Sequence, residues 1–141
     1  MLRQLLLLLA ITLILVSCDP GFAVILNNNS DKDKNVTVSK VPRQELLDKD
    51  SIAIADTSQM DFYSGNIKRQ NIFLSKKDTL NNSYSFVLGK GKRALIQGGM
   101  GWPDLNQKII VDKFDTISLK QDKRTVIRKK VMYTSVITTI W

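Results

Sequence analysis

Apolar and polar residues alternate along most of this chain with a period of two. Residues 22–26 form an apolar run that ends in the turn-forming cluster 27–31, and Val36 and Val38 then alternate with polar Thr37 and Ser39. Such alternation is typical of β-strands, whose successive side chains point to opposite faces. The pattern predicts that the chain opens with a pair of strands joined by a polar loop.

Further strand-like segments recur at short intervals and are separated by turns rich in Gly, Asp and Lys. They lie at 52–54, 72–74, 84–88, 94–97, 108–111, 116–119, 125–128 and 131–140. Arg43–Asp48 could form one helical turn, and 76–78 predicts a turn. This spacing predicts an all-β fold, a single β-sandwich of about seven to nine antiparallel strands over residues 22–141.

The last strand-like segment carries apolar residues on both of its faces. Tyr133, Ile137 and Trp141 share one face, and Met132, Val136 and Ile140 share the other. A strand with two apolar faces is typically covered on both sides. We therefore expect the C-terminal segment to be structural.

The glycine-rich segment 89–94 superficially matches a nucleotide-binding pattern. A phosphate site of that kind needs the glycines between a strand and the N-terminus of a helix. Here Leu95 and Ile96 lead directly to Gly98 and Gly99, which leaves no room for a helix. The segment predicts a hairpin turn instead.

The N-terminus has a different pattern from the rest of the chain. Arg3 precedes an almost unbroken apolar run at 5–16, which ends at Ser17 and Cys18. This is the layout of a secretory signal peptide. The run is shorter than the roughly 20 apolar residues that span a bilayer.

The residues Leu15, Val16, Ser17 and Cys18 resemble the lipobox of bacterial lipoproteins. The resemblance implies that a peptidase removes residues 1–17 and that Cys18 becomes the lipid-attachment site, with 18–21 as a lipidated tether. Two or three acyl chains hold a soluble domain firmly in a membrane. The chain is similar to small envelope lipoproteins that carry one immunoglobulin-like or related β-sandwich. The expected location is the bacterial cell envelope, with the choice between inner and outer membrane open.

The chain is strongly basic, with a formal net charge of +8. The densest cluster of basic residues consists of Lys120, Lys123, Arg124, Arg128, Lys129 and Lys130, of which the last five are the candidate contacts. Such a cluster can attract acidic headgroups, glycans or another polyanion, or it can be a solvated strand edge that discourages aggregation. We favour the solvated edge, and export argues against nucleic acid as a partner.

A second candidate contact lies in the segment 98–104, where three glycines precede Trp102 and Pro103. An exposed tryptophan on such a loop could stack on a sugar or anchor an envelope protein. Because large rings usually end in the core, we favour a corner that buries Trp102.

The composition argues against catalysis and metal binding. The chain has no His, one Cys and one Glu, so the commonest general base and the commonest metal ligand are missing. We expect no enzyme activity, no metal and no cofactor. The sequence predicts a lipid-anchored envelope protein with a binding or scaffolding domain. Polyanion or glycan recognition through the basic cluster or Trp102 is the alternative, and a small hydrolase without His is the third.

Overall fold

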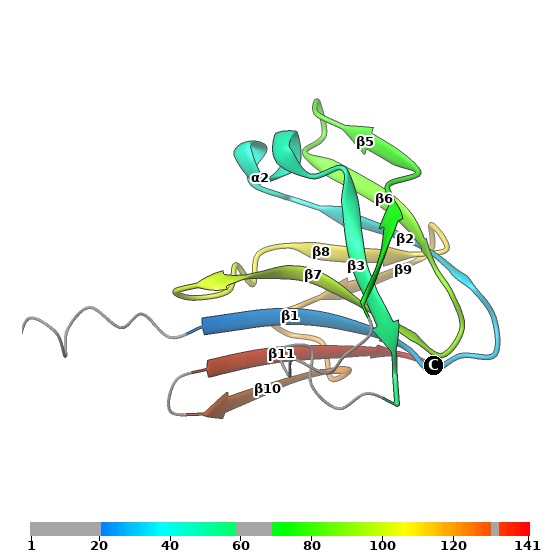
Figure 1. Ribbon diagram of the computed structural model, residues 1–141, viewed down its shortest axis with the longest axis vertical. Coiled ribbons are helices and arrows are strands. Elements are labelled where there is room, and N and C mark those ends of the chain that lie inside the picture. Colours follow the sequence, from blue (N-terminus) through cyan, green and yellow to red (C-terminus); the bar gives the residue numbers. More distant parts are fainter. Residues whose placement is uncertain (1–20, 59–68, 131–132) are drawn as a thin grey trace, which may run out of the picture.

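The computed structural model describes residues 21–58, 69–130 and 133–141, which form a sandwich of two β-sheets (Figure 1). The described elements are β1 (Gly21–Asn28), β2 (Lys34–Ser39), α2 (Arg43–Asp48), β3 (Ser51–Asp56), β4 (Gln70–Phe73), β5 (Lys76–Asp78), β6 (Ser83–Leu88), β7 (Lys92–Met100), β8 (Lys108–Val111), β9 (Asp115–Ser118), β10 (Thr125–Lys130) and β11 (Tyr133–Ile140). One sheet has the strand order β10-β11-β1-β7-β3-β4 and the other β5-β6-β2-β8-β9. The predicted all-β sandwich is confirmed, and so is the short helix.

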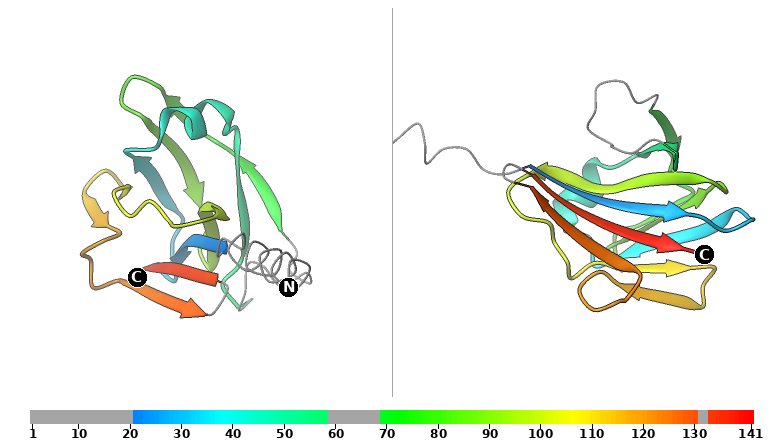
Figure 2. Two further views of the ribbon diagram at one scale, coloured as in Figure 1. Left: turned by 90° about the vertical axis from the view of Figure 1, so that its left-hand side faces the viewer. Right: turned by 90° about the horizontal axis from the view of Figure 1, so that it is seen from below.

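Two details of the sandwich differ from the expectation. The described residues contain eleven strands rather than seven to nine, because each strand-like segment of the sequence forms a strand of its own and β5 adds one more at a sheet edge. Not all neighbours are antiparallel, since β1 pairs in parallel with β11 along its whole length, from Gly21 opposite Tyr133 to Asn28 opposite Ile140. Figure 2 shows these two strands running side by side from the same end of the molecule.

The two opening strands and the polar loop between them are present as predicted, but the two strands do not share a sheet. β1 lies in the six-stranded sheet and β2 in the five-stranded sheet, so the loop between them crosses from one layer to the other. The reason lies in burial. Ala23 and Ile25 are buried on the outer face of β1 while Val24 and Leu26 are buried on its inner face, and a strand covered on both faces belongs in the middle of a sheet.

The turn expected at 76–78 is also wrong, because these residues form β5. Lys76, Lys77 and Asp78 pair with Ser85, Tyr84 and Ser83 of β6. The sequence carries no sign of this strand, because its three side chains are polar and show no apolar alternation. They still form a strand, because an edge strand needs backbone hydrogen bonds on one side only. Charged residues are common on such edges because they discourage pairing with other chains.

The core lies between the two sheets. Its largest fully buried side chains include Leu26, Leu46, Tyr84 and Phe86. A smaller apolar cluster around Ala23, Ile25 and Ala55 covers the outer face of the six-stranded sheet, with Tyr133 and Ile137 packed against it. The inner face of β11 is buried at Val136 and Ile140, as expected. Its outer face is only partly covered, because Tyr133 and Ile137 are half-buried and Trp141 is 77% exposed. Met132 lies outside the described residues.

The glycine-rich segment forms the expected hairpin turn between β6 and β7. The amide of Lys92 donates to the carbonyl of Gly89 over 3.2 Å. Gly91 has a φ of +66°, a conformation that glycine adopts without steric cost. No helix follows the turn, so the nucleotide-binding pattern has no structural basis here.

Candidate functional site

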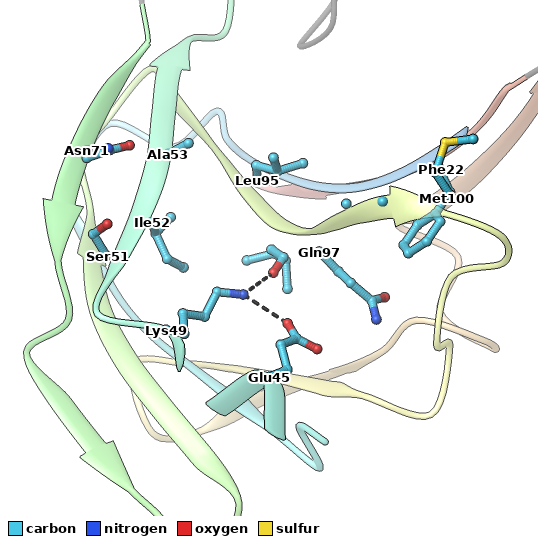
Figure 3. Close-up of a pocket in the computed structure, with 13 residues that line it drawn as sticks. Phe22, Glu45, Lys49, Ser51, Ile52, Ala53, Asn71, Leu95, Gln97 and Met100 are labelled. Carbon is cyan, nitrogen blue, oxygen red and sulfur yellow. Dashed lines mark hydrogen bonds and ion pairs between the residues drawn. The ribbon is translucent and has the colours of Figure 1, made fainter. Parts of the chain in front are cut away.

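A groove opens where the six-stranded sheet splits between β3 and β7. The two strands pair only from Ile54 opposite Ala94 to Asp56 opposite Lys92. Beyond that point β3 diverges, and within the described residues β7 continues to Met100 with β1 as its single neighbour. The resulting groove has a volume of about 560 Å³ (Figure 3), which lies in the range of ligand sites.

The groove has an apolar base and a polar wall. Phe22, Ile52 and Ile96, which also belong to the core, line it together with the backbone of β7. Glu45 of α2 and Lys49 just after this helix face them (Figure 3). The groove can therefore bury apolar groups beside a charged wall.

Lys49 is held by three contacts at the split in the sheet. Its Nζ donates to the carbonyl of Ile96 over 2.7 Å and to Oε1 of Glu45 over 3.0 Å. It also lies 4.8 Å from the centroid of the Tyr84 ring. In the pairing of β7 with β1, Ile96 has no partner residue and forms a β-bulge. Lys49 therefore supplies a hydrogen bond to a carbonyl that lies outside the regular pairing of these two strands.

Tyr84 contacts the same Ile96 carbonyl from the core side. Its hydroxyl donates to the carbonyl of Ile96 over 3.3 Å. Burial raises the pKa of this hydroxyl well above its ordinary value, and the charge of Glu45 adds to the effect. Tyr84 therefore stays neutral and acts as a hydrogen-bond donor rather than as a base.

The upper rim of the groove is a strand edge with little side-chain cover. Gly98, Gly99 and Met100 are exposed, although all three belong to β7. A Cβ atom at Gly99 would touch only the ring of Phe22, at an ordinary distance of 3.6 Å. Glycines in a strand often mark a place where another backbone approaches closely.

Trp102 lies on the surface, so the interpretation that buried it in the core is wrong. Its side chain is 70% exposed. Gly101 has a φ of +98°, which turns the chain out of β7 before the ring can enter the core. The ring lies 5.9 Å from Nζ of Lys129 on β10, so the structure brings two of the predicted contact residues together.

The basic cluster does not form one surface. Lys123 and Arg124 precede β10, whereas Arg128, Lys129 and Lys130 lie in its second half. β10 is antiparallel to β11, which places these two groups at opposite ends of the sheet. The side chain of Lys130 lies outside the described residues, as does all of Cys18.

Arg124 is occupied by intramolecular ion pairs. Its guanidinium donates to Asp122 and to Asp115 of β9. These hydrogen bonds raise the pKa of Arg124, and the bond from Arg124 lowers the pKa of Asp122. Arg124 therefore stabilises the loop that connects the two sheets. Because its guanidinium is used in these ion pairs, it is poorly placed to bind an external ligand.

A smaller cavity of about 250 Å³ lies on the outer face of the six-stranded sheet. Arg93 and Arg128 line it together with Ile25, Val126 and Ile137. Arg93 is largely buried and donates to the carbonyl of Thr57 over 2.8 Å. Arg128 lies at the same cavity, whose positive charge suits an anionic group.

The part of the chain that the structure describes contains no group of three acidic, His or Cys side chains placed to hold a metal ion. None of its helices has the length and apolar character needed to cross a membrane. No family model matches the chain, and no curated protein or solved structure matches it either.

Sequence reasoning missed the residues that define the groove. Glu45 and Lys49 looked like ordinary charges around a helical turn. Gln97, which also lines the groove, looked like the end of a strand. Only the spacing of Glu45 and Lys49, four residues apart as in helical ion pairs, could have suggested that they meet. Nothing in the sequence indicated that β3 and β7 diverge there.

Proposed function

We propose that this protein is a lipid-anchored, non-catalytic protein of the bacterial cell envelope whose β-sandwich, of the immunoglobulin-like or a related kind, binds an extended segment of a partner protein. The observation that carries the binding role is the open edge of β7. Six residues of this strand, 95–100, lie beyond its pairing with β3. An open strand edge accepts a further strand through main-chain hydrogen bonds.

The groove adds specificity to this edge. An added strand would place alternate side chains toward the apolar base at Phe22 and Ile52. Natural proteins usually block open edges with charges or bulges. Lys49 and the bulge at Ile96 do so at the inner part of the split, whereas Gly98 and Gly99 leave the outer part open.

The anchor rests on the N-terminal pattern and on the short tether it leaves. Cys18 stands three residues before Gly21, the first residue of β1. Lipidation at Cys18 would therefore hold the domain directly at the membrane surface. The chain would bind its partner there rather than free in solution.

The anchor is tested by the intact mass of the protein purified from a bacterial membrane fraction. We expect a species that begins at Cys18 and carries added acyl mass, and we expect Cys18→Ala to release the protein from the membrane. A mass that begins at Met1 or after an ordinary cleavage would contradict the anchor. So would unchanged membrane association of Cys18→Ala.

The groove is tested by site-specific photo-crosslinking in cells. A photoreactive residue at Met100, which lines the groove and is 69% exposed, should yield one adduct that maps to an extended segment of one envelope protein. The same residue at Leu80, which is 94% exposed in the turn between β5 and β6, is the matched control.

Gly99→Val then blocks the groove, because its methyl groups enter the space beside Phe22. We expect this variant to lose the Met100 adduct while its free energy of unfolding changes by no more than about 0.5 kcal/mol. An adduct that persists in Gly99→Val, or that forms equally from Leu80, would rule out binding in the groove.

Recognition of a polyanion or glycan through the basic cluster or Trp102 is the second candidate. It is favoured by the positive charge of Arg93 and Arg128 at one cavity. Binding of a soluble anionic glycan should weaken steeply as salt rises. A hydrolase without His is the third, and specific labelling of one Ser by an activity-based probe would support it.

A further inference from the structure

The start of β1, the exposed Trp102 and the basic end of β10 lie at one end of the sandwich. Gly21 pairs with Met100 of β7 on one side and with Tyr133 of β11 on the other. Tyr133 in turn pairs with Lys130 of β10. The chain therefore enters the sheet at the same end at which β7 and β10 finish (Figure 1).

Two exposed side chains project at this end. Met100 is 69% exposed and Trp102 is 70% exposed, although both are large and apolar. The ammonium group of Lys129 lies 5.9 Å from the centroid of the Trp102 ring. An aromatic ring beside a basic group suits the interface between water and a bilayer, where tryptophan is enriched and lysine meets acidic headgroups.

The charge at this end is available to an external partner. No ion pair in the described part of the chain involves Arg128 or Lys129, in contrast to Arg124 at the other end of β10. The loop 101–107 contains one acidic residue, Asp104, whose carboxylate accepts the amide of Asn106 over 2.9 Å.

We propose that this end of the domain, with Trp102 and Lys129 at its surface, docks on an anionic phospholipid bilayer. The inference rests on the proposed anchor at Cys18, because three residues of chain reach at most about 10 Å. The tether therefore holds this end, and no other, against the headgroups. Docking fixes the orientation of the domain, with the β1–β11 strands rising from the membrane.

The chain contains a matched internal control. Its two tryptophans lie at opposite ends of the sandwich, because Trp141 follows Ile140, which pairs with Asn28 at the far end of β1. The eight residues of β1 separate the two ends by roughly 23 Å. Trp141 is also exposed, at 77%, so it reports on any contact of the far end.

The experiment uses the full acylated protein in vesicles of phosphatidylglycerol and phosphatidylcholine with brominated acyl chains, because bromine quenches only nearby tryptophans. Trp141→Phe leaves Trp102 as the reporter near the anchor, and Trp102→Phe leaves Trp141. We expect quenching of Trp102 that weakens in pure phosphatidylcholine and at high salt, with little quenching of Trp141.

A charge variant tests the role of the basic end of β10 in the Trp141→Phe background. Lys129→Gln should lower the ratio of docked to undocked molecules about five-fold, which corresponds to about 1 kcal/mol for one basic residue at an anionic surface. Lys123→Gln makes the same chemical change just before β10, at the far end, and should leave the quenching unchanged.

Failure of docking and failure of the anchor are distinguishable. Intact mass and flotation with vesicles report the anchor, whereas quenching reports the contact. A protein that floats with unquenched Trp102 overturns the docking and leaves the anchor in place. Equal quenching of both tryptophans overturns the proposed orientation. Equal quenching of Trp102 in anionic and neutral vesicles overturns the proposed binding to anionic headgroups.

Discussion

Arg124 shows how much the environment of a single side chain decides. The sequence placed it in a basic cluster, but its hydrogen bonds to Asp115 and Asp122 give it a structural role within the domain. Lys129, five residues along, instead lies beside Trp102. Residue type and spacing could not separate the two roles, because the acidic partners come from the preceding strand and loop.

We expect Arg124→Gln to lower the free energy of unfolding by about 1 kcal/mol at neutral pH, since it removes partly exposed charged hydrogen bonds. Lys123→Gln, at an exposed neighbour without a described ion pair, should change it by no more than about 0.5 kcal/mol. Urea denaturation of both variants measures the difference.

The pH dependence of that difference has a defined sign. The pKa of Asp122 is lowered in the folded state, so its contribution is present above the ordinary pKa of an aspartate and is lost as pH falls through the lowered value. The gap between the native protein and Arg124→Gln should therefore narrow in acid. A gap that widens in acid would contradict the ion pair.

Tyr84 carries a second pH-dependent prediction. Its pKa is raised by burial, so its contribution to stability is complete below the ordinary pKa of about 10 and is lost as pH rises further. Tyr84→Phe should cost about 1 kcal/mol at neutral pH and should lose less stability than the native protein above about pH 10. Urea denaturation across this range tests it, and parallel alkaline losses in both proteins would be the contrary result.

At the scale of elements, α2 depends on packing rather than on its own sequence. It has six residues and no side-chain hydrogen bond at its N-cap, and helices this short are marginal in water. Leu46 is fully buried in the core, while the adjacent Leu47 is half exposed. Tertiary contact through Leu46 therefore holds this wall of the groove in place.

Leu46→Ala should lower the free energy of unfolding by about 2 to 5 kcal/mol, because it leaves a cavity in the core. Leu47→Ala makes the same chemical change on the exposed side and should cost no more than about 0.5 kcal/mol. Thermal or urea denaturation of the pair measures this. Equal losses would show that α2 does not pack as described.

Most elements followed from local patterns, whereas their assembly did not. The boundaries expected for β1, β6 and β8 lie within about two residues of those observed, as is usual for strand ends. β5 was missed because its side chains are polar, and its strand character comes from backbone bonds to β6. The groove was missed because no local signal marks where β3 leaves β7.

At the scale of the whole molecule, the last strand, β11, lies inside the six-stranded sheet. β11 lies between β10 and β1, and it pairs with the strand that begins the domain. Val136 and Ile140 contribute to the core. Pairings between distant parts of a chain form late and make folding slow.

Deleting residues 133–141 should therefore abolish cooperative unfolding, since it exposes the edges of two strands and removes core side chains at once. Deleting Trp141 alone, which is 77% exposed, should preserve the cooperative transition. Urea titration followed by circular dichroism distinguishes the two truncations. A cooperative transition in the longer deletion would show that β11 is dispensable.

The sequence by itself determined the all-β class, the place of most strands, the short helix and the hairpin at Gly91, because these depend on side-chain periodicity and on turn residues a few positions apart. It also predicts the lipid anchor at Cys18. Only the tertiary structure decided which strands share a sheet, the parallel pairing of β1 with β11, the groove between β3 and β7, and the exposed Trp102 beside Lys129. These features depend on pairing between distant backbone segments, whose hydrogen-bonding groups are the same in every residue except proline and therefore leave no local mark in the sequence.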